Sequence, residues 1–296
     1  MNRQGGIGEG VPHIRALREF GSTGRDVAVV GQGSWRSEEA IPATAIASLR
    51  RGLDLGMTHI DTAEMYGSGA AEKMIGAAIA GRRDEVFLVS KVLPGNASFR
   101  GTIAACEKSL ARLQTDRLDC YLLHWPGNHP LADTIAAFES LLKDGKILSW
   151  GVSNFDVVDL EEVSSIAGPG HPACNQVLYH LKERAIEHAV LPWCEAHATA
   201  VVAYTPFGQT PAIFEARSTQ GEVLHSIAAA HGGTAHQVAL AFLLRHRNTF
   251  VIPKAARIDH VAENAGAAAL QLTDAEAARI DAAFPRGKPR RALPMI

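Results

Sequence analysis

Cysteine is scarce in this sequence, and the motifs of common metal sites are absent. Only four of the 296 residues are cysteines, and no two of them form the CxxC pair of zinc and redox-disulfide sites. Thirteen histidines occur, yet none belongs to an HExxH motif or to an HxH motif at the end of an expected strand. We therefore expect no metal, and we expect the cysteines to be reduced thiols that mostly fill the core. They are Cys106, Cys120, Cys174 and Cys194.

Long apolar runs and an excess of one charge are also missing. No apolar stretch approaches the roughly 18 residues of a membrane-spanning helix, and the opening MNRQGGIGEG lacks the apolar centre of a secretion signal. The 29 basic and 31 acidic residues give a net charge of -2, with no long run of either sign. These absences predict a cytoplasmic metabolic protein that binds a small molecule, and neither nucleic acid nor a membrane. We expect it to be a monomer.

Helical and strand patterns alternate from residue 41 onward, with about eight strands nearly all separated by helices. The clearest strand patterns cover residues 59–60, 86–92, 118–124, 147–152, 173–177, 200–204 and 250–252. Helical spacing covers residues 41–55, 71–79, 103–113, 131–142, 157–166, 191–197, 221–231, 234–246, 258–269 and 274–284. Such alternation is typical of a parallel sheet with helical crossovers, either a doubly wound open sheet or a closed (β/α)8 TIM barrel.

The dinucleotide-binding fingerprint of the open sheet is incomplete. GQGSWR, from Gly31, has only the first two glycines of GxGxxG, and GIGEG, from Gly6, follows no expected strand. The number of strand–helix units in this length favours the barrel. Before the alternation, IRALREF and VAVV flank the turn GSTGRD and predict a β-hairpin, which we expect to close the barrel bottom. Residues 1–12 are expected to be flexible and residues 13–296 to form a single domain.

Polar and aromatic side chains stand at the carboxyl ends of the expected strands, where function collects in a TIM barrel. Lys91 ends the apolar run FLVSK, so its ammonium must find a counter-charge or lose its proton; Asp61, one strand earlier, is the nearest candidate. A lysine beside Tyr66 would lower the pKa of the phenol from about 10 and make it a general acid. His124 could orient a carbonyl group or share the proton. The full set is Trp35, Asp61, Tyr66, Lys91, His124, Trp125, Ser153, Asn154, Gln176, Tyr204 and Lys254.

Each of these residues also has an ordinary structural explanation. Asp61 suits a turn or helix cap, Tyr66 a packing role and His124 a core position. Ser153 and Asn154 could begin the next helix. Their occurrence together on neighbouring strand ends favours a functional site over separate structural roles.

Seven motifs, in order, resemble the aldo-keto reductases over nearly the whole chain: DTAEMYG, SKVLP, YLLHWP, GVSNF, NQVLYH, AYTPFG and IPKAARIDHVAEN. The resemblance implies a TIM-barrel oxidoreductase that reduces small aldehydes or ketones to alcohols with NAD(P)H. It also implies that Asp61, Tyr66, Lys91 and His124 are catalytic. In this set Tyr66 protonates the carbonyl oxygen, Lys91 paired with Asp61 lowers the pKa of the phenol, and His124 holds the carbonyl.

The resemblance places the cofactor on the strand ends that follow. Ser153, Asn154 and Gln176 would bind the nicotinamide carboxamide, and Tyr204 would stack on the ring. Thr205 and Phe207, on the next positions of the same segment, belong to this set.

The adenosine end of the cofactor is implied on the loop after the last strand. Lys254, Glu263 and Asn264 match the family's phosphate and adenine contacts. Many members carry a serine after the lysine and an arginine six residues past it, whereas this chain has Ala255 and His260. Because Lys254 and Arg257 still supply positive charge beside His260, we expect NADPH, with NADH as the weaker alternative.

The substrate is less strongly indicated. Trp35 and Trp125 are expected to form an apolar wall, and the tail after Phe284 is short, which favours a small aldehyde. The motifs resemble most a bacterial subgroup that reduces methylglyoxal and other small reactive aldehydes.

Two alternative functions are a redox-sensing regulatory subunit with the same fold and a metal-dependent barrel hydrolase. The intact set of catalytic residues disfavours the first, and the missing ligand clusters disfavour the second.

Overall fold

Eight parallel strands form a closed barrel in the computed structural model, which describes residues 16–290 and 292–296. Hydrogen bonds join them in chain order, and the backbone amide of Gly31 donates to the carbonyl of Val251, which closes the ring. The expected TIM barrel is confirmed. The strands are β3 (Gln32–Gly33), β4 (His59–Asp61), β5 (Phe87–Val92), β6 (Cys120–Leu123), β7 (Trp150–Ser153), β8 (Cys174–Leu178), β9 (Ala200–Tyr204) and β10 (Thr249–Val251).

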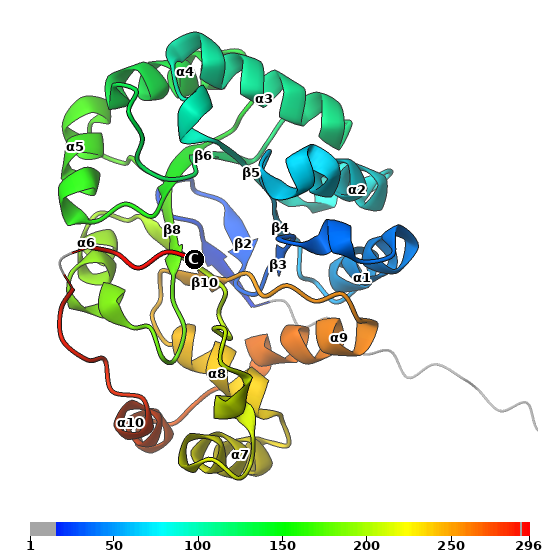
Figure 1. The fold of residues 1–296 in the computed structure, drawn as a ribbon, viewed down its shortest axis with the longest axis vertical. Helices are drawn as coiled ribbons and strands as arrows, with labels where there is room; N and C mark the ends of the chain where they lie inside the picture. The colour runs from blue at the N-terminus through cyan, green and yellow to red at the C-terminus, as the bar shows by residue number, and fades with distance from the viewer. Residues whose placement is uncertain (1–15, 291) are drawn as a thin grey trace, which may run out of the picture.

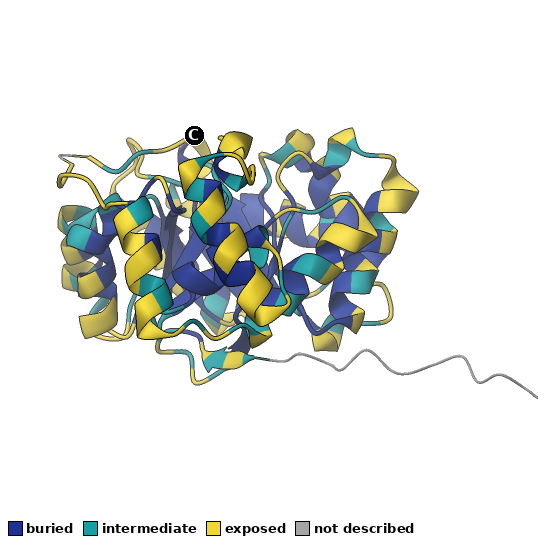
Figure 2. Ribbon diagram, turned by 90° about the horizontal axis from the view of Figure 1, so that it is seen from below, coloured by how far each residue is buried: buried dark blue, intermediate teal, exposed yellow. Residues whose placement is uncertain are grey.

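Helices surround the barrel (Figure 1) and turn their buried faces toward it and their exposed faces outward (Figure 2). Strands β5 to β8 are buried along their whole length, as expected for parallel strands that are covered on both faces. The helices are α1 (Pro42–Asp54), α2 (Ala70–Ile79), α3 (Phe99–Leu113), α4 (Leu131–Lys143), α5 (Val157–Ala167), α6 (Val190–Ala196), α7 (Thr219–His231), α8 (Ala235–Leu243), α9 (Ile258–Gly266) and α10 (Asp274–Ala283).

Side-chain caps set where several helices begin. Thr234 and Gln237 form a capping box at the start of α8, in which each side chain bonds the backbone N–H of the other residue. Helix α3 begins four positions before the expected start at residue 103 because the Ser98 hydroxyl accepts from the backbone amide of Gly101. Such caps satisfy amide groups that have no partner within the helix.

The expected hairpin is present, formed by β1 (Leu17–Glu19) and β2 (Asp26–Ala28). Phe20, in its turn, is fully buried against the rings of His59, Phe87 and Phe250, whose ring centroids lie 5.7, 4.7 and 5.0 Å away. Because His59 and Phe87 begin their strands, the hairpin closes the amino-terminal end of the barrel. The chain's carboxyl end lies at the opposite end (Figure 2). Residues 1–12 and Ile14 lie outside the described residues.

The first barrel strand, β3, had no counterpart in the sequence prediction. It has only two residues, one polar and one glycine, so it carries no apolar pattern. Gln32 is buried and donates from Nε2 to the carbonyls of Leu49 and Met57. A Cβ at Gly33 would lie 2.6 Å from the carbonyl oxygen of Ile252, so glycine permits the close approach of the chain there.

The composition also led to expectations about the cysteines, membrane-spanning helices and metal-binding groups. The cysteines are all free and buried, as predicted. In the described part of the chain, no helix has the length and apolar character needed to cross a membrane. Across the same residues, no group of three or more His, Cys, Asp or Glu side chains is arranged to hold a metal ion.

Candidate active site

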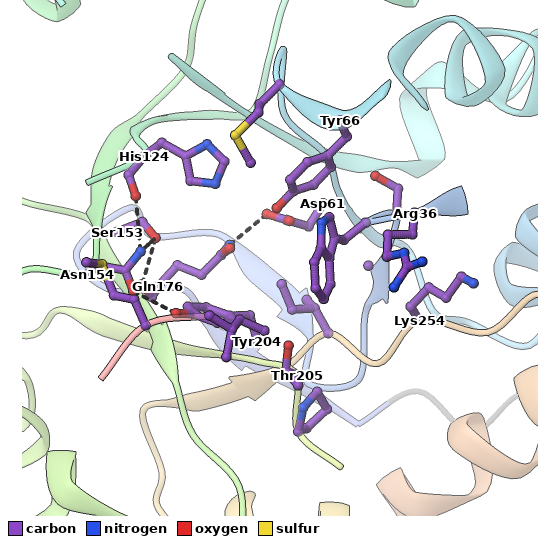
Figure 3. A pocket seen from close by; sticks show the side chains of 18 of the residues that line it. Arg36, Asp61, Tyr66, His124, Ser153, Asn154, Gln176, Tyr204, Thr205 and Lys254 are labelled. Atoms are coloured by element: carbon purple, nitrogen blue, oxygen red, sulfur yellow. Dashed lines mark hydrogen bonds between the residues drawn. The ribbon is translucent and has the colours of Figure 1, made fainter. Parts of the chain in front are cut away.

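A cavity of about 850 Å³ opens where the barrel strands end (Figure 3). It gathers predicted site residues from β4, from the β3–α1 loop and from the ends of β6 to β10. The predicted residues that line it are Trp35, Asp61, Tyr66, His124, Trp125, Ser153, Asn154, Gln176, Tyr204, Thr205, Phe207 and Lys254. Lys91 is fully buried directly behind this lining.

Lys91 connects the acidic and phenolic groups of the site. Its Nζ donates to Oδ1 of Asp61 at 2.6 Å, to the carbonyl of Thr62 at 2.7 Å and to the hydroxyl of Tyr66 at 3.2 Å. Burial alone would lower the pKa of Lys91, but the attraction of Asp61 and Tyr66 outweighs it and raises the pKa above its usual value. The ammonium is therefore charged at neutral pH. Burial raises the pKa of its partner Asp61, and the attraction of Lys91 and the hydrogen bonds from Lys91 and Gln176 oppose that rise.

The expectation of a lowered pKa for Tyr66 is wrong for this structure. Burial of the phenol raises its pKa, and the opposing attraction of Lys91 does not cancel that effect. The phenolate would lie in a poorly hydrated site, so the neutral form is favoured. Tyr66 consequently retains its proton, with Lys91 placed to stabilise the anion that a proton transfer would leave.

His124 faces Tyr66, with ring centroids 5.8 Å apart. Burial, and then the charge of Lys91, lower the pKa of His124 to about 2. The imidazole is therefore neutral at physiological pH. It can donate one hydrogen bond, but it does not serve as the acid that protonates the substrate. Of the two roles expected for His124, orienting a carbonyl fits this state.

The predicted carboxamide-binding residues form one network with the catalytic residues. Nε2 of Gln176 donates to Oδ2 of Asp61 at 2.7 Å, and the hydroxyl of Ser153 donates to the backbone carbonyl of Gln176 at 2.8 Å. Asn154 donates from Nδ2 to the carbonyl of His124 at 3.1 Å, and its Oδ1 accepts from Tyr204 at 2.9 Å. These bonds between strand ends orient the side chains along one wall of the cavity (Figure 3).

The structure does not bring all of the predicted adenosine-end residues to the cavity. Lys254 is exposed at its edge. Arg257 pairs with Asp259 through a 2.5 Å contact, and both side chains are exposed. The remaining predicted residues lie on α9 outside the cavity lining: His260 is exposed, Glu263 half-buried and Asn264 buried.

Several lining residues were not predicted from the sequence. Arg36 follows Trp35, has a left-handed backbone (φ 59°) and pairs with Glu39 at 2.7 Å. Met65, within the DTAEMYG motif, also lines the cavity. Arg36 and Met65 directly adjoin Trp35 and Tyr66, which the sequence analysis assigned to the site. Their position beside these residues was the one signal in the sequence that could have identified them.

The chain's carboxyl-terminal residues also reach the cavity, a position that the sequence analysis did not predict. Met295 and Ile296 line it. An extended segment spans up to about 3.3 Å per residue, so even a short tail can cross from α10 to the barrel mouth. No periodic pattern in the tail signals this position.

Comparisons with known proteins agree with this arrangement. The model of the Aldo/keto reductase family matches residues 29–284. Methylglyoxal reductase YeaE of Escherichia coli (strain K12) is 47% identical, over 90% of this chain and 94% of that protein. Glyoxal reductase of Bacillus subtilis (strain 168) is 36% identical, over 85% of this chain and 87% of its own. A crystal structure of an aldo/keto reductase from Klebsiella pneumoniae in complex with NADP and acetate has a TM-score of 0.89 and 43% identity, covering 95% of this chain and 100% of that one. The chain belongs to the aldo/keto reductase family.

Proposed function

We propose that this protein is an NADP(H)-dependent reductase that converts small aldehydes and ketones, including 2-oxoaldehydes such as methylglyoxal, to alcohols. The observation that carries the proposal is the place of Tyr66 in the cavity lining, with the Lys91 ammonium 3.2 Å from its hydroxyl. The E. coli and B. subtilis relatives are named for reducing methylglyoxal and glyoxal, and the Klebsiella structure holds NADP.

Tyr66 acts as the general acid. It gives its hydroxyl proton to the carbonyl oxygen as negative charge develops there, and the positive charge of Lys91 stabilises the phenolate left behind. Asp61 keeps Lys91 charged and positioned. A proton donor held in this way contributes roughly 10²- to 10⁴-fold in rate.

His124 positions the substrate. As a neutral imidazole facing Tyr66, it can donate a hydrogen bond to the same carbonyl oxygen. Two donors that converge on one oxygen fix the carbonyl relative to the cavity wall. Trp125, whose ring centroid lies 4.8 Å from that of His124, adds an apolar surface beside it, and Trp35 is expected to complete the wall.

The residues present fit a nicotinamide cofactor. Hydroxyl and amide groups of Ser153, Asn154 and Gln176 lie along one wall with the aromatic ring of Tyr204, a set suited to a carboxamide and a planar ring. A bound NADPH supplies the hydride that reduces the carbonyl carbon. Thr205 and Phe207 border this wall, and the ammonium of Lys254 at the cavity edge offers positive charge to a phosphate group.

We also propose that the protein is a monomer and that it acts in the cytoplasm. Four buried thiols suit a reducing compartment. Sedimentation of the purified chain tests the monomer, and a dimer at micromolar concentration would contradict it.

The decisive experiment is oxidation of NADPH and NADH with methylglyoxal, glyceraldehyde and nitrobenzaldehyde. Reduction of at least one aldehyde, with NADPH preferred, is expected. If the protein binds NADPH but reduces no carbonyl compound, the regulatory alternative replaces the enzyme.

A further inference from the structure

Glu38 is a half-buried carboxylate beside the active site, and the proposed mechanism does not use it. It lies in the single helical turn Ser37–Glu39 of the β3–α1 loop. Its Oε2 atom is buried and has no hydrogen-bond partner among the residues that the structure describes. Burying such an oxygen without a donor costs free energy. The next residue, Glu39, is instead exposed and pairs with Arg36 at 2.7 Å, so a surface ion pair explains Glu39 but not Glu38.

The side chain of Glu38 packs against the backbone of the segment that carries Tyr66. A Cβ atom at Gly67, the residue after Tyr66, would lie 2.6 Å from Cγ and 3.0 Å from Cδ of Glu38. Gly67 also has a left-handed backbone, with φ of 55°. Because Gly67 has no side chain, the Glu38 carboxyl group can occupy the space next to Tyr66.

The phenol of Tyr66 has ionisable neighbours on several sides. Lys91 from β5 and Asp61 from β4 lie behind its hydroxyl, and the neutral His124 faces its ring. Burial raises the pKa of Tyr66, the attraction of Lys91 opposes this rise, and the negative charges of Asp61 and then Glu38 add to it. Glu38 therefore acts on the phenol from the side of the β3–α1 loop, opposite in sign to Lys91.

Three other titratable side chains lie near the Glu38 turn or the phenol. Arg36 is exposed, so solvent screens its attraction for Glu38. Glu72, on α2 against this turn, is held by Arg112. Tyr204 keeps its proton near neutral pH because burial raises its pKa. Within the described residues, none of the three donates a hydrogen bond to the buried oxygen of Glu38.

We infer that Glu38 is a positioning residue of the reductase, a fixed negative charge that keeps Tyr66 in its proton-bearing form and so sets the alkaline limit of aldehyde reduction. The inference rests on the proposed function, in which Tyr66 is the general acid. A phenolate beside a second anion is less stable than one beside a neutral side chain, so Glu38 disfavours loss of the proton to solvent. The reaction is unchanged: the carbonyl oxygen receives the proton of Tyr66, and the carbonyl carbon receives the hydride of NADPH. Reduction therefore continues to a higher pH than it would without Glu38.

The test is Glu38→Gln, which removes the charge and keeps the shape of the side chain. Single-turnover reduction of nitrobenzaldehyde at saturating NADPH is measured from about pH 7 to about pH 11. The rate should fall at high pH as Tyr66 loses its proton. In Glu38→Gln the midpoint of that fall should lie about 0.5 to 1 pH unit below the wild-type midpoint, with no loss of rate near pH 7. A merely structural defect would instead lower the rate at every pH.

Glu38→Asp and Glu39→Gln are the matched controls. The first keeps a negative charge beside Gly67, so its midpoint should stay closer to that of the wild type than the midpoint of Glu38→Gln does. The second removes the charge of the adjacent carboxylate, which is exposed and screened by solvent. Its midpoint should equal that of the wild type.

Nuclear magnetic resonance measures the proton of Tyr66 without turnover. In protein made with carbon-13-labelled tyrosine, the Cζ signal of each of the four tyrosines reports whether its hydroxyl is ionised. The signal that is missing from Tyr66→Phe belongs to Tyr66. Its titration midpoint should be lower in Glu38→Gln by about the same amount as the kinetic midpoint.

Two outcomes overturn the inference and leave the proposed function intact. One is a kinetic or titration midpoint that Glu38→Gln does not change. The other is an equal fall of the midpoint in Glu38→Gln and Glu38→Asp, which would assign the effect to shape and not to charge. If the wild type reduces no aldehyde at any pH, the proposed function fails and the inference fails with it.

Discussion

The side chain of Gln176 donates a hydrogen bond to Asp61, from Nε2 to Oδ2, over 2.7 Å. Oδ1 of the same carboxylate accepts from Lys91. The buried carboxylate of Asp61 therefore connects Gln176, in the wall proposed to bind nicotinamide, with Lys91, which lies behind Tyr66. Two bonds thus link Gln176 to Lys91, and a third links Lys91 to the hydroxyl of Tyr66, although Gln176, Asp61 and Lys91 belong to three different strands.

Gln176→Met should impair both cofactor binding and proton donation. Methionine matches the length of glutamine but leaves Oδ2 of Asp61 buried without this donor, which costs about 1–3 kcal/mol. We expect a weaker NADPH affinity and a kcat lowered about tenfold. Ser153→Ala is the comparison, because it spares the bond to Asp61 and should weaken NADPH binding alone. Stopped-flow kinetics and fluorescence titration separate the two effects; an unchanged kcat in Gln176→Met would refute the connection.

Tyr66→Phe should abolish most activity without loss of cofactor. The substitution removes the hydroxyl and keeps the ring, so aldehyde reduction should fall by about two orders of magnitude or more. The Kd for NADPH should stay within about twofold, since the ring that packs beside His124 remains. Steady-state assays with methylglyoxal check the rate, and wild-type turnover in the variant would exclude Tyr66 as the acid.

Lys254→Ala should weaken NADPH more than NADH. A charge-assisted bond to phosphate is worth about 1.5–3 kcal/mol, so the Kd for NADPH should rise about tenfold or more. Lys73→Ala is the matched control, because that lysine is exposed on α2 and lies outside the cavity lining. Equal effects of Lys254→Ala on both cofactors would place the 2′-phosphate elsewhere.

His59 should make the protein sensitive to acid. Burial, followed by repulsion from Lys91, lowers the pKa of His59 to about 3, from 6.5 for an unperturbed histidine. The unfolded chain therefore takes up a proton below pH 6.5 that the folded chain refuses, and stability falls as the pH drops from 6.5 toward 3. The loss is about 1.4 kcal/mol per pH unit for one such group.

His59→Leu should flatten that dependence. Neither nitrogen of His59 has a hydrogen-bond partner within the described residues, so an apolar side chain among Phe20, Phe87 and Phe250 leaves no bond broken. Urea midpoints between pH 7 and 4 measure the effect. His129→Gln, on an exposed loop, should keep the wild-type slope. An unaltered slope in His59→Leu would show that other groups take up the protons.

Most of the strand-end residues were predictable because they end or follow a short apolar run, and the barrel rule then brings those ends together. The contacts between these residues were not predictable. Gln176 and Asp61 stand 115 positions apart, and nothing local marks them as partners. The raised pKa of Tyr66 depends on how deeply the phenol is buried, which sequence proximity to Lys91 does not reveal. Likewise β3 is too short, and the tail too irregular, to carry a pattern.

The hairpin at the barrel's closed end has consequences for synthesis. Arg18 donates to the carbonyl of His246, 228 positions further along the chain, and Phe20 packs on Phe250. On the ribosome the hairpin emerges well before these partners, because His246 is made 228 residues after Arg18. Phe20, the large apolar residue of the hairpin turn, therefore lacks Phe250 until that later segment is made, so shorter nascent or truncated chains leave its ring exposed. Barrel closure is therefore a late, long-range step in folding.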